Sequence, residues 1–448
     1  MIGYRFFVLF LVTSSVSFMF ANRIVFGLTV LCQVKPDING TSEYYLNDSS
    51  QQTWMYTIIA IGSCIGPIPL YWGDKLSTKL LLIIYGTISA LSSLLYPLAD
   101  SSGFTMAMIT RFFAGFAQAS QSYFSNELVL TWAGVDERSF FFSFILGSAQ
   151  FGSLIAMALG GELCSTLGWE VVYYLLGLLT LLSTIVSAYY YNDNVQNARL
   201  CSDNEKKRIL QGKSVVNKSE KVPYKSLLLD KTIIVAIFLF VCYNIGMIVF
   251  QQYIPTYFND QLGISIRGTG YFAAIPMAIA IALKIVLGRV LDLDLGFSKT
   301  VTFNSLVIII ELVAGIALFL TGMTNDQTLS LIYSMIYGSL HLFVPVITNR
   351  TIQAVAHQHA HFAMNISMIL TGLSQILVPL CVQLILSYGQ GNNWSLLFTL
   401  TAILTIGSTI IYIIFARVKL ASWVQKVPEQ TSNRYTKKSS VADFDMKI

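Results

Sequence analysis

The chain has 448 residues, of which 54% are hydrophobic and only 11% are charged. Soluble proteins usually carry about a quarter charged residues, so this composition cannot cover a water-exposed surface. It excludes an ordinary soluble enzyme, a nucleic-acid-binding protein and a disordered chain. It predicts a protein whose surface faces lipid.

Twelve apolar runs are long enough to cross a bilayer. A spanning segment must satisfy its backbone hydrogen bonds internally, and the alternation typical of a β-barrel is absent, so we predict twelve helices. The first run continues past Arg23 to Cys32, which favours a retained helix over a cleaved signal peptide. The runs cover residues 6–34, 52–72, 79–98, 104–130, 139–165, 169–191, 232–257, 268–291, 300–321, 328–350, 362–387 and 394–416.

Basic residues are concentrated on one side of the predicted spans. Connections after the even-numbered helices carry most of the loop Lys and Arg, whereas those after odd-numbered helices carry only Lys35 and Arg267. The positive-inside rule therefore predicts that both termini are cytoplasmic. The loop 35–51 then faces the outside or a lumen, and its two acceptor sequons predict glycosylation at Asn39 and Asn47.

A polar, basic segment divides the twelve runs into six and six. We predict an N-terminal six-helix bundle over 1–192, a cytoplasmic linker over 193–231, a C-terminal six-helix bundle over 232–417 and a disordered cytoplasmic tail over 418–448. This layout resembles that of the major facilitators, in which two bundles enclose a midplane site. The predicted fold class is an all-α membrane protein with twelve transmembrane helices in two six-helix bundles.

A more specific resemblance lies in helices 4 to 7. The stretch from Arg111 to Gln118, followed by Trp132 to Ser139, resembles the R-x-x-x-G-x-x-E…W-x-P-x-x-E-R-S pattern of the anion:cation symporters. That family includes sodium–phosphate cotransporters, sialin and the vesicular glutamate transporters. Cys242 to Gly246 and Pro255 to Tyr257 are similar to its C-Y-N-W-G…P-T-Y pattern in helix 7. The resemblance implies a transporter of anions.

Short loop fragments resemble the gate motif G-x-x-x-D-(R/K), which major facilitators carry after helices 2 and 8. Its acidic residue caps a neighbouring helix end and pairs with cations, which latches the cytoplasmic side. The copy after helix 2 lacks the first glycine, and ordinary turn residues are the alternative reading. Together with the helix 4–5 motif, the resemblance implies a cytoplasmic gate made of Asp74, Lys75, Glu137, Arg138, Gly288 and Asp292.

Two arginines lie inside predicted spans, where an ionised side chain costs about 3 kcal/mol. We predict that Arg23 and Arg111 bind an anionic substrate, because a guanidinium meets a carboxylate or phosphate with two hydrogen bonds. Gln118, Tyr243 and Asn244 are the predicted hydrogen-bonding partners of that anion. Packing against backbone carbonyls is the alternative for the arginines. The glutamate-selective relatives carry an arginine in place of Tyr243, so glutamate is not the expected substrate.

Proton coupling by the family's route is not expected, because two acidic positions of the family are amides here. Gln118 replaces an acid in helix 4, and Asn22 replaces an aspartate in helix 1. An amide keeps the shape and hydrogen bonds but cannot take up a proton. The coupling candidates are Asn22 and, as a substitute acid, Glu127. On one continuous helix it would face nearly away from Gln118 and lie about 13 Å deeper.

Two further charges lie within the second half. Lys284 in helix 8 and Glu311 in helix 9 are at similar depth when counted from the same end, so we predict a structural ion pair between them.

The cysteines and histidines predict no special chemistry. The six cysteines show no CxxC pair and no close spacing, so they are predicted to be apolar fillers rather than a disulfide framework. His357 and His361 have helical spacing, but no carboxylate or cysteine lies between them. No metal site is therefore predicted.

These features predict a secondary active or facilitative transporter of a small organic or inorganic anion that works by alternating access. No P-loop and no nucleophile–histidine–acid set is present, so neither an ATP-driven pump, an enzyme nor a cofactor is expected. The expected partners are the anion, sodium or a proton as coupling ion, and lipid, but no nucleic acid. We expect a monomer in the plasma membrane or in lysosomal or vesicular membranes. A receptor or scaffold that keeps the fold without transport is the alternative.

Overall fold

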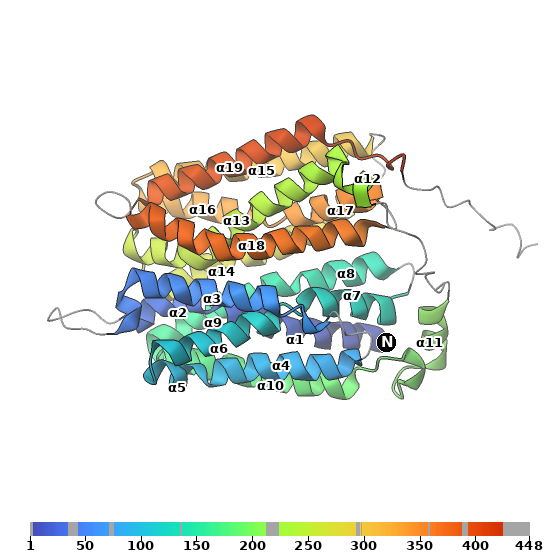
Figure 1. The fold of residues 1–448 in the computed structure, drawn as a ribbon, viewed down its shortest axis with the longest axis horizontal. Coiled ribbons are helices and arrows are strands. Elements are labelled where there is room, and N and C mark those ends of the chain that lie inside the picture. The colour runs from blue at the N-terminus through green and yellow to red at the C-terminus, as the bar shows by residue number, and fades with distance from the viewer. Residues whose placement is uncertain are drawn as a thin grey trace, which may run out of the picture.

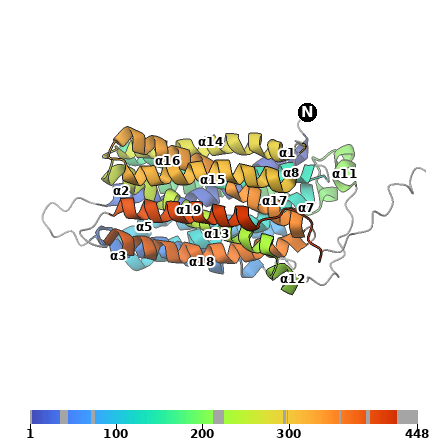
Figure 2. The ribbon, with the colours of Figure 1, turned by 90° about the horizontal axis from the view of Figure 1, so that it is seen from above.

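The computed structural model is built from helices that run along one common axis (Figures 1 and 2). It describes residues 3–34, 44–70, 76–134, 137–211, 224–292, 296, 298–356, 359–387 and 393–423. Within these residues, nine helical stretches are long and apolar enough to cross a membrane, and Thr78–Leu94 is a shorter apolar helix. Each of the twelve predicted runs corresponds to one helical rod, which confirms the predicted fold class.

The first six rods form the lower layer in Figure 1, coloured from blue to green. Within it α1 packs on α9 and α10, and α6 packs on α3 and α4. The helices are α1 (Tyr4–Ile24), α2 (Phe26–Gln33), η1 (Tyr45–Asn47), α3 (Ser49–Ile65), α4 (Thr78–Leu94), α5 (Tyr96–Ser101), α6 (Phe104–Gln118), α7 (Gln121–Trp132), α8 (Arg138–Leu146), α9 (Ser148–Thr166) and α10 (Trp169–Tyr190).

The last six rods form the upper layer, coloured from yellow-green to red. Here α13 packs on α17, α18 and α19, and α15 packs on α16 and α19. The helices are α13 (Lys231–Asp260), α14 (Ile266–Asp292), α15 (Lys299–Met323), α16 (Gln327–His341), α17 (Val344–Ala356), α18 (Ala360–Ser387) and α19 (Trp394–Phe415). Aspartate and serine caps start several of them, such as Asp230 at α13 and Asp326 at α16.

The two ends of the molecule differ. One end carries the N terminus and the segment between the layers, which contains η4 (Val195–Asn197), α11 (Asp203–Leu210) and α12 (Tyr224–Leu228); we call it the linker end. The opposite end carries η1, and we call it the loop end. There Tyr44 donates a hydrogen bond of 2.9 Å to Asp100 on α5. Burial raises the pKa of this phenol, so it stays a donor at neutral pH.

The two layers meet where α3 packs on α18, where α2 packs on α13 and α14, and where α9 packs on α14. The α9–α14 pair is closest at two glycines, since a Cβ added to Gly161 would lie 2.8 Å from the Cα of Gly270. Small residues allow helix backbones to approach closely inside a membrane.

Several predicted spans are interrupted helices rather than single ones. The first rod breaks at Val25, the fourth at Ala119 and Ser120, and the tenth at Leu342 and Phe343. The fourth and tenth rods occupy equivalent places in the two halves. In transporters, interrupted helices at corresponding places are a pointer to the binding site.

Candidate functional site

Arg23 lies near the end of α1, in the loop-end half of the first rod. Its side chain is buried, and its Nη1 donates a hydrogen bond of 3.3 Å to Oε1 of Gln118, the last residue of α6. The guanidinium lies 5.8 Å from the ring centroid of Phe20. Within the described residues it forms no salt bridge, and its buried Nε has no hydrogen-bond partner. Arg23 is therefore a buried cation held by a neutral amide.

Arg111 has a different set of contacts. Its Nη1 donates to the carbonyl of Asn22 at 3.2 Å, and its Nη2 donates to the carbonyl of Arg23 at 2.8 Å. In a continuous helix these carbonyls would accept from the N–H groups four residues later, across the break at Val25. The rings of Phe26 and Tyr96 cover the guanidinium, with centroids 4.9 and 5.6 Å away. Arg111 thus donates hydrogen bonds to backbone carbonyls at the end of α1.

Asn22 faces into the first bundle rather than toward the second. Its Nδ2 donates to the hydroxyl of Ser89 on α4 at 3.0 Å and to the hydroxyl of Thr180 on α10 at 2.9 Å. These contacts join α1 to α4 and α10, so the amide of Asn22 has structural hydrogen-bond partners within the first bundle. Its assignment as a coupling residue remains a prediction.

Gln118 stands at the centre of a short hydrogen-bond chain. Besides accepting from Arg23, it donates 2.8 Å to Gln121, which in turn donates 3.0 Å to Ser148 on α9. The chain crosses the break between α6 and α7. It therefore connects the guanidinium of Arg23 to the helix that contacts the second bundle.

Glu127 is not on the same helix as Gln118. The break at Ala119 and Ser120 separates α6 from α7, so the rotation and depth predicted for Glu127 on one continuous helix stay predictions. Its side chain is half-buried on α7. A coupling role for Glu127 is untested by these contacts.

Tyr243 and Asn244 lie in the middle of α13. Nδ2 of Asn244 donates 2.7 Å to the carbonyl of Phe240, one turn earlier, which occupies one amide hydrogen. The Tyr243 ring is buried and lies 5.0 Å from the ring of His341, while its carbonyl lies 3.2 Å from Nε2 of the same histidine. Tyr243 therefore packs inside the second bundle, and binding of a substrate by either residue stays a prediction.

The predicted ion pair between Lys284 and Glu311 is wrong. Glu311 on α15 instead contacts Nδ1 of His341 on α16, at 2.9 Å through Oε2 and 3.1 Å through Oε1. In the part of the chain that the structure describes, Lys284 forms no ion pair. Similar depth was a correct premise, but depth does not say which neighbouring helix a side chain faces.

His341 was missed as a site residue. The available signal was its position, since it is the histidine that falls inside a predicted span rather than after helix 10. A titratable side chain at membrane depth is a functional candidate.

Glu137 pairs with two arginines at the linker end. It accepts from Nε and Nη2 of Arg5 at 2.7 and 2.8 Å, and from Arg208 on α11 at 3.1 Å. Glu205 on α11 also accepts from Arg5, through Nη1 at 3.1 Å. The network fixes α11 to the start of α1 and α8. Sequence reasoning found Glu137 but missed Arg5 and Glu205.

The other predicted gate residues are described only in part. Arg138 begins α8, and its buried Nε has no hydrogen-bond partner among the described residues. Gly288 and Asp292 belong to α14, but their side-chain surroundings are outside the described residues. Asp74, Lys75 and Asn39 lie wholly outside them, whereas Asn47 is exposed at the loop end.

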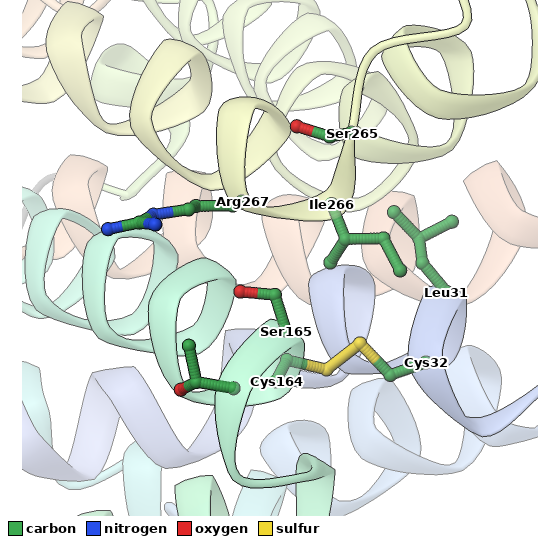
Figure 3. A pocket seen from close by; sticks show the side chains of 8 residues that line it. Leu31, Cys32, Cys164, Ser165, Ser265, Ile266 and Arg267 are labelled. Carbon is green, nitrogen blue, oxygen red and sulfur yellow. A yellow bond between two sulfur atoms is a disulfide. The ribbon is translucent and has the colours of Figure 1, made fainter.

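A disulfide corrects the prediction for the cysteines. Cys32 at the end of α2 and Cys164 in the last turn of α9 are joined, with their Cα atoms 6.4 Å apart. They are 132 residues apart in the chain, and this long separation hid the pairing. The disulfide lines a pocket of about 650 Å³ at the loop end, between α2, α9 and the start of α14 (Figure 3).

An ion pair beside this pocket bridges the two layers. Arg267 on α14 donates from Nε to Oε2 of Glu162 on α9 at 2.6 Å, and the hydroxyl of Tyr271 donates to the same oxygen at 2.8 Å. Figure 3 shows Arg267 reaching from α14 over α9. The contact lies one residue from the close approach at Gly161. The loop end is therefore held together by both packing and charge.

Comparisons with known proteins place the chain in a family. The sequence model described as "Major Facilitator Superfamily" matches residues 6–379. Sodium-dependent phosphate transport protein 3 of Mus musculus is 24% identical over 399 residues, covering 87% of this chain and 83% of that protein. The probable small intestine urate exporter of Mus musculus is 22% identical, covering 82% and 76%. Sialin of Homo sapiens is 21% identical, covering 87% and 80%.

Solved structures agree in fold. The D-xylose–proton symporter superposes with a TM-score of 0.68 at 16% identity, covering 93% of this chain and 99% of that one. A bacterial homologue of the human lysosomal transporter Spinster, inward-facing and occupied, gives a TM-score of 0.67 at 13% identity, covering 93% and 97%. These relatives are transporters, which confirms that the chain is not an enzyme. The chain belongs to the Major Facilitator Superfamily of membrane transporters, and the relatives it matches are the anion:cation symporters that its motifs resemble.

Proposed function

We propose that this protein is a secondary transporter of a small organic or inorganic anion, with Arg23 as the cation that binds it. The observation that carries the proposal is the state of Arg23. Its guanidinium is buried, contacts the neutral Gln118 and forms no salt bridge among the described residues. An uncompensated cation inside a membrane is costly, and a bound anion would neutralise it.

Arg111 acts in this proposal as a support rather than as the main ligand. Its two Nη atoms already hold the carbonyls at the break of α1. It therefore fixes the backbone of Arg23 and adds positive potential nearby. The names of the phosphate, urate and sialic acid transporters among the relatives suggest which anions to test first.

Alternating access is the proposed mechanism, in which the two bundles rock about the site. The Glu162–Arg267 pair and the glycine contact between α9 and α14 close the loop end in the present conformation. The opposite conformation requires these contacts to separate. The ion pair is exposed to solvent, so it contributes little to stability and can break readily.

The linker end is the proposed cytoplasmic end. Disulfides persist on the oxidising side of a membrane, and Cys32–Cys164 lies at the loop end. Asn47, one of the two predicted glycosylation sites, is exposed at the same end. This agrees with the orientation predicted from the basic loops.

The test is uptake of inorganic phosphate, urate and sialic acid into proteoliposomes. Replacing Arg23 by alanine should lower uptake of the transported anion about 10- to 100-fold, because one charge-assisted contact contributes about 1.5–3 kcal/mol. Arg199→Ala is the matched control, since Arg199 is exposed in the linker. Uptake unaffected by Arg23→Ala would refute the role of Arg23. No uptake of any anion by correctly folded wild-type protein would favour the receptor or scaffold reading.

A further inference from the structure

The second bundle contains a buried acid–base pair, formed by Glu311 and His341, that lies outside the proposed anion site. Glu311 and His341 are 0% and 1% exposed, and they join α15 to α16. Each lies near the middle of its rod, so the pair is at the middle of the membrane span. Titratable side chains at this depth are costly and usually mark pathways for ions or protons.

The contacts of His341 define how many protons the pair holds. Nε2 faces the carbonyl of Tyr243, which can only accept a hydrogen bond, so Nε2 must carry a proton. On the other side, Nδ1 faces the carboxyl group of Glu311 at 2.9 Å. One further proton must lie in that contact, either on Nδ1 or on the carboxyl oxygen. With both protons present, the pair is neutral and both hydrogen bonds are made.

Losing one proton breaks this arrangement. The pair then carries a net charge of minus one inside the membrane. Either a lone pair on Nε2 faces the Tyr243 carbonyl, or a lone pair on Nδ1 faces the Glu311 carboxylate. In each case one contact becomes repulsive. The conformation in hand is therefore the proton-loaded one, and proton release favours a different arrangement of α13, α15 and α16.

Among the described residues, no lysine or arginine forms an ion pair that would hold the deprotonated pair. The titratable side chains in contact are the phenols of Tyr243, on α13, and Tyr337, whose ring stacks on His341 at 4.7 Å. The remaining titratable or charged groups of the middle portions of the packed helices are Cys242 on α13, Lys284 on α14, Arg350 on α17 and Tyr412 on α19.

The site is shaped to admit the imidazole. A Cβ added to Gly246 on α13 would lie 2.9 Å from Nε2 of His341 and would collide with the hydroxyl of Tyr337. The glycine thus lets both rings reach the α13 backbone. Movement of either ring is transmitted directly to the helix that carries Tyr243 and Asn244.

The position of His341 relates it to the anion site. His341 is the last residue of α16 before the break in the tenth rod, as Gln118 is the last residue of α6 before the break in the fourth. Both half-helices have 15 residues and start at the loop end. Gln118 contacts the cation Arg23, and His341 contacts the carbonyl of Tyr243. The helix breaks at equivalent places in the two bundles therefore lie beside the Arg23–Gln118 contact and the Glu311–His341 pair.

We infer that the Glu311–His341 pair is a proton-binding site that couples proton movement to anion transport. This rests on the proposed function. The step consumes one proton from the aqueous phase on one side and returns one to the other side. No covalent bond other than the N–H or O–H bond forms or breaks. The pair would supply the proton coupling that the amides Asn22 and Gln118 cannot supply.

The test compares two transport modes in proteoliposomes with phosphate, urate and sialic acid as probes. Wild-type protein should accumulate its anion about tenfold for each coupled proton under a gradient of one pH unit. Glu311→Gln and His341→Gln should abolish this accumulation but retain exchange of labelled for unlabelled anion at equal pH. Variants that still follow the pH gradient, or wild-type uptake indifferent to it, would overturn the inference.

Matched controls separate coupling from general damage. Glu170→Gln changes an exposed acid in the first turn of α10, and His359→Gln changes a histidine outside the pair. Both should keep pH-driven accumulation. Wild-type protein that performs neither accumulation nor exchange would contradict the proposed function rather than the proton site.

A second measurement does not need transport. The imidazole of His341 in the purified wild-type protein can be followed by ¹⁵N nuclear magnetic resonance, with His341→Gln assigning its signal. The ring nitrogens should change protonation over the pH range in which the protein stays folded, and Glu311→Gln should shift that transition. A ring that keeps one protonation state across this range would make the pair purely structural.

Discussion

Two arginines on adjacent helices perform different tasks at the level of single residues. Arg111 donates both Nη atoms to carbonyls of α1, whereas Arg23 donates one Nη atom to the amide of Gln118; the buried Nε of each arginine has no partner in the described chain. In the proposed function, backbone support falls to Arg111 and anion binding to Arg23.

This division of labour predicts different responses to substitution. Arg111→Ala leaves two buried carbonyls without partners, which should destabilise the protein by about 2–4 kcal/mol. Arg111→Lys should restore little, because a single ammonium cannot reach both carbonyls with the geometry of a guanidinium. Thermal unfolding in detergent measures the effect, with Arg23→Lys as the comparison. Full stability of Arg111→Ala combined with lost anion binding would make Arg111 a ligand.

Sequence reasoning found some of these residues and missed others for a physical reason. A cation within an apolar run stands out, so Arg23 and Arg111 could be found from the sequence. The partner of Glu311 could not, because Lys284 and His341 are at similar depth and only packing decides which helix Glu311 faces. Tertiary packing decides which of two neighbouring helices a side chain faces, and the sequence alone does not give it.

Interrupted helices are the main feature at the level of elements. The number and limits of the twelve rods could be predicted because apolar length is a one-dimensional signal. The breaks at Val25 and Ser120 carry no proline or glycine at those positions. The first depends on the contact of Arg111 with the carbonyls of α1, so composition does not reveal it. The break at Leu342, in contrast, lies close to Pro345 in the first turn of α17.

The α9–α14 contact predicts the effect of a bulkier residue. Gly161→Leu would push the two backbones apart at the loop end, and overpacking costs about 1–3 kcal/mol. If the cost falls on the closed conformer alone, its population should drop about 5- to 150-fold, and exchange should slow accordingly.

Alkylation of an engineered cysteine tests whether Gly161→Leu affects the closed conformer. Ser153 on α9 is buried and accepts a hydrogen bond from Gln251 on α13, so a cysteine placed there reports opening between the bundles. In a background without free cysteines, Gly161→Leu should speed its alkylation from the loop end. Gly407→Leu is the matched control, since a Cβ there meets nothing within 4 Å. Equal alkylation rates in both variants would argue against a gate at α9–α14.

On the scale of the whole molecule, the contacts that join helices at the two ends and the helix breaks at the centre lie at different depths. The Glu162–Arg267 pair and the disulfide lie at the loop end, the Arg5–Glu137–Glu205 network lies at the linker end, and the central breaks lie between them. Binding at the centre can therefore change either end only through movement of whole helices. This is the arrangement that alternating access requires.

The central claim is that Arg23 binds the transported anion, and equilibrium binding tests it most directly. Titrating purified wild-type protein, Arg23→Lys and Arg23→Ala with phosphate, urate and sialic acid gives a Kd for each. We predict that Arg23→Ala weakens binding of one anion about 10- to 100-fold, while Arg23→Lys, which keeps the charge but not the planar fork, is intermediate. An unchanged Kd in Arg23→Ala, with the fold intact, would contradict the account.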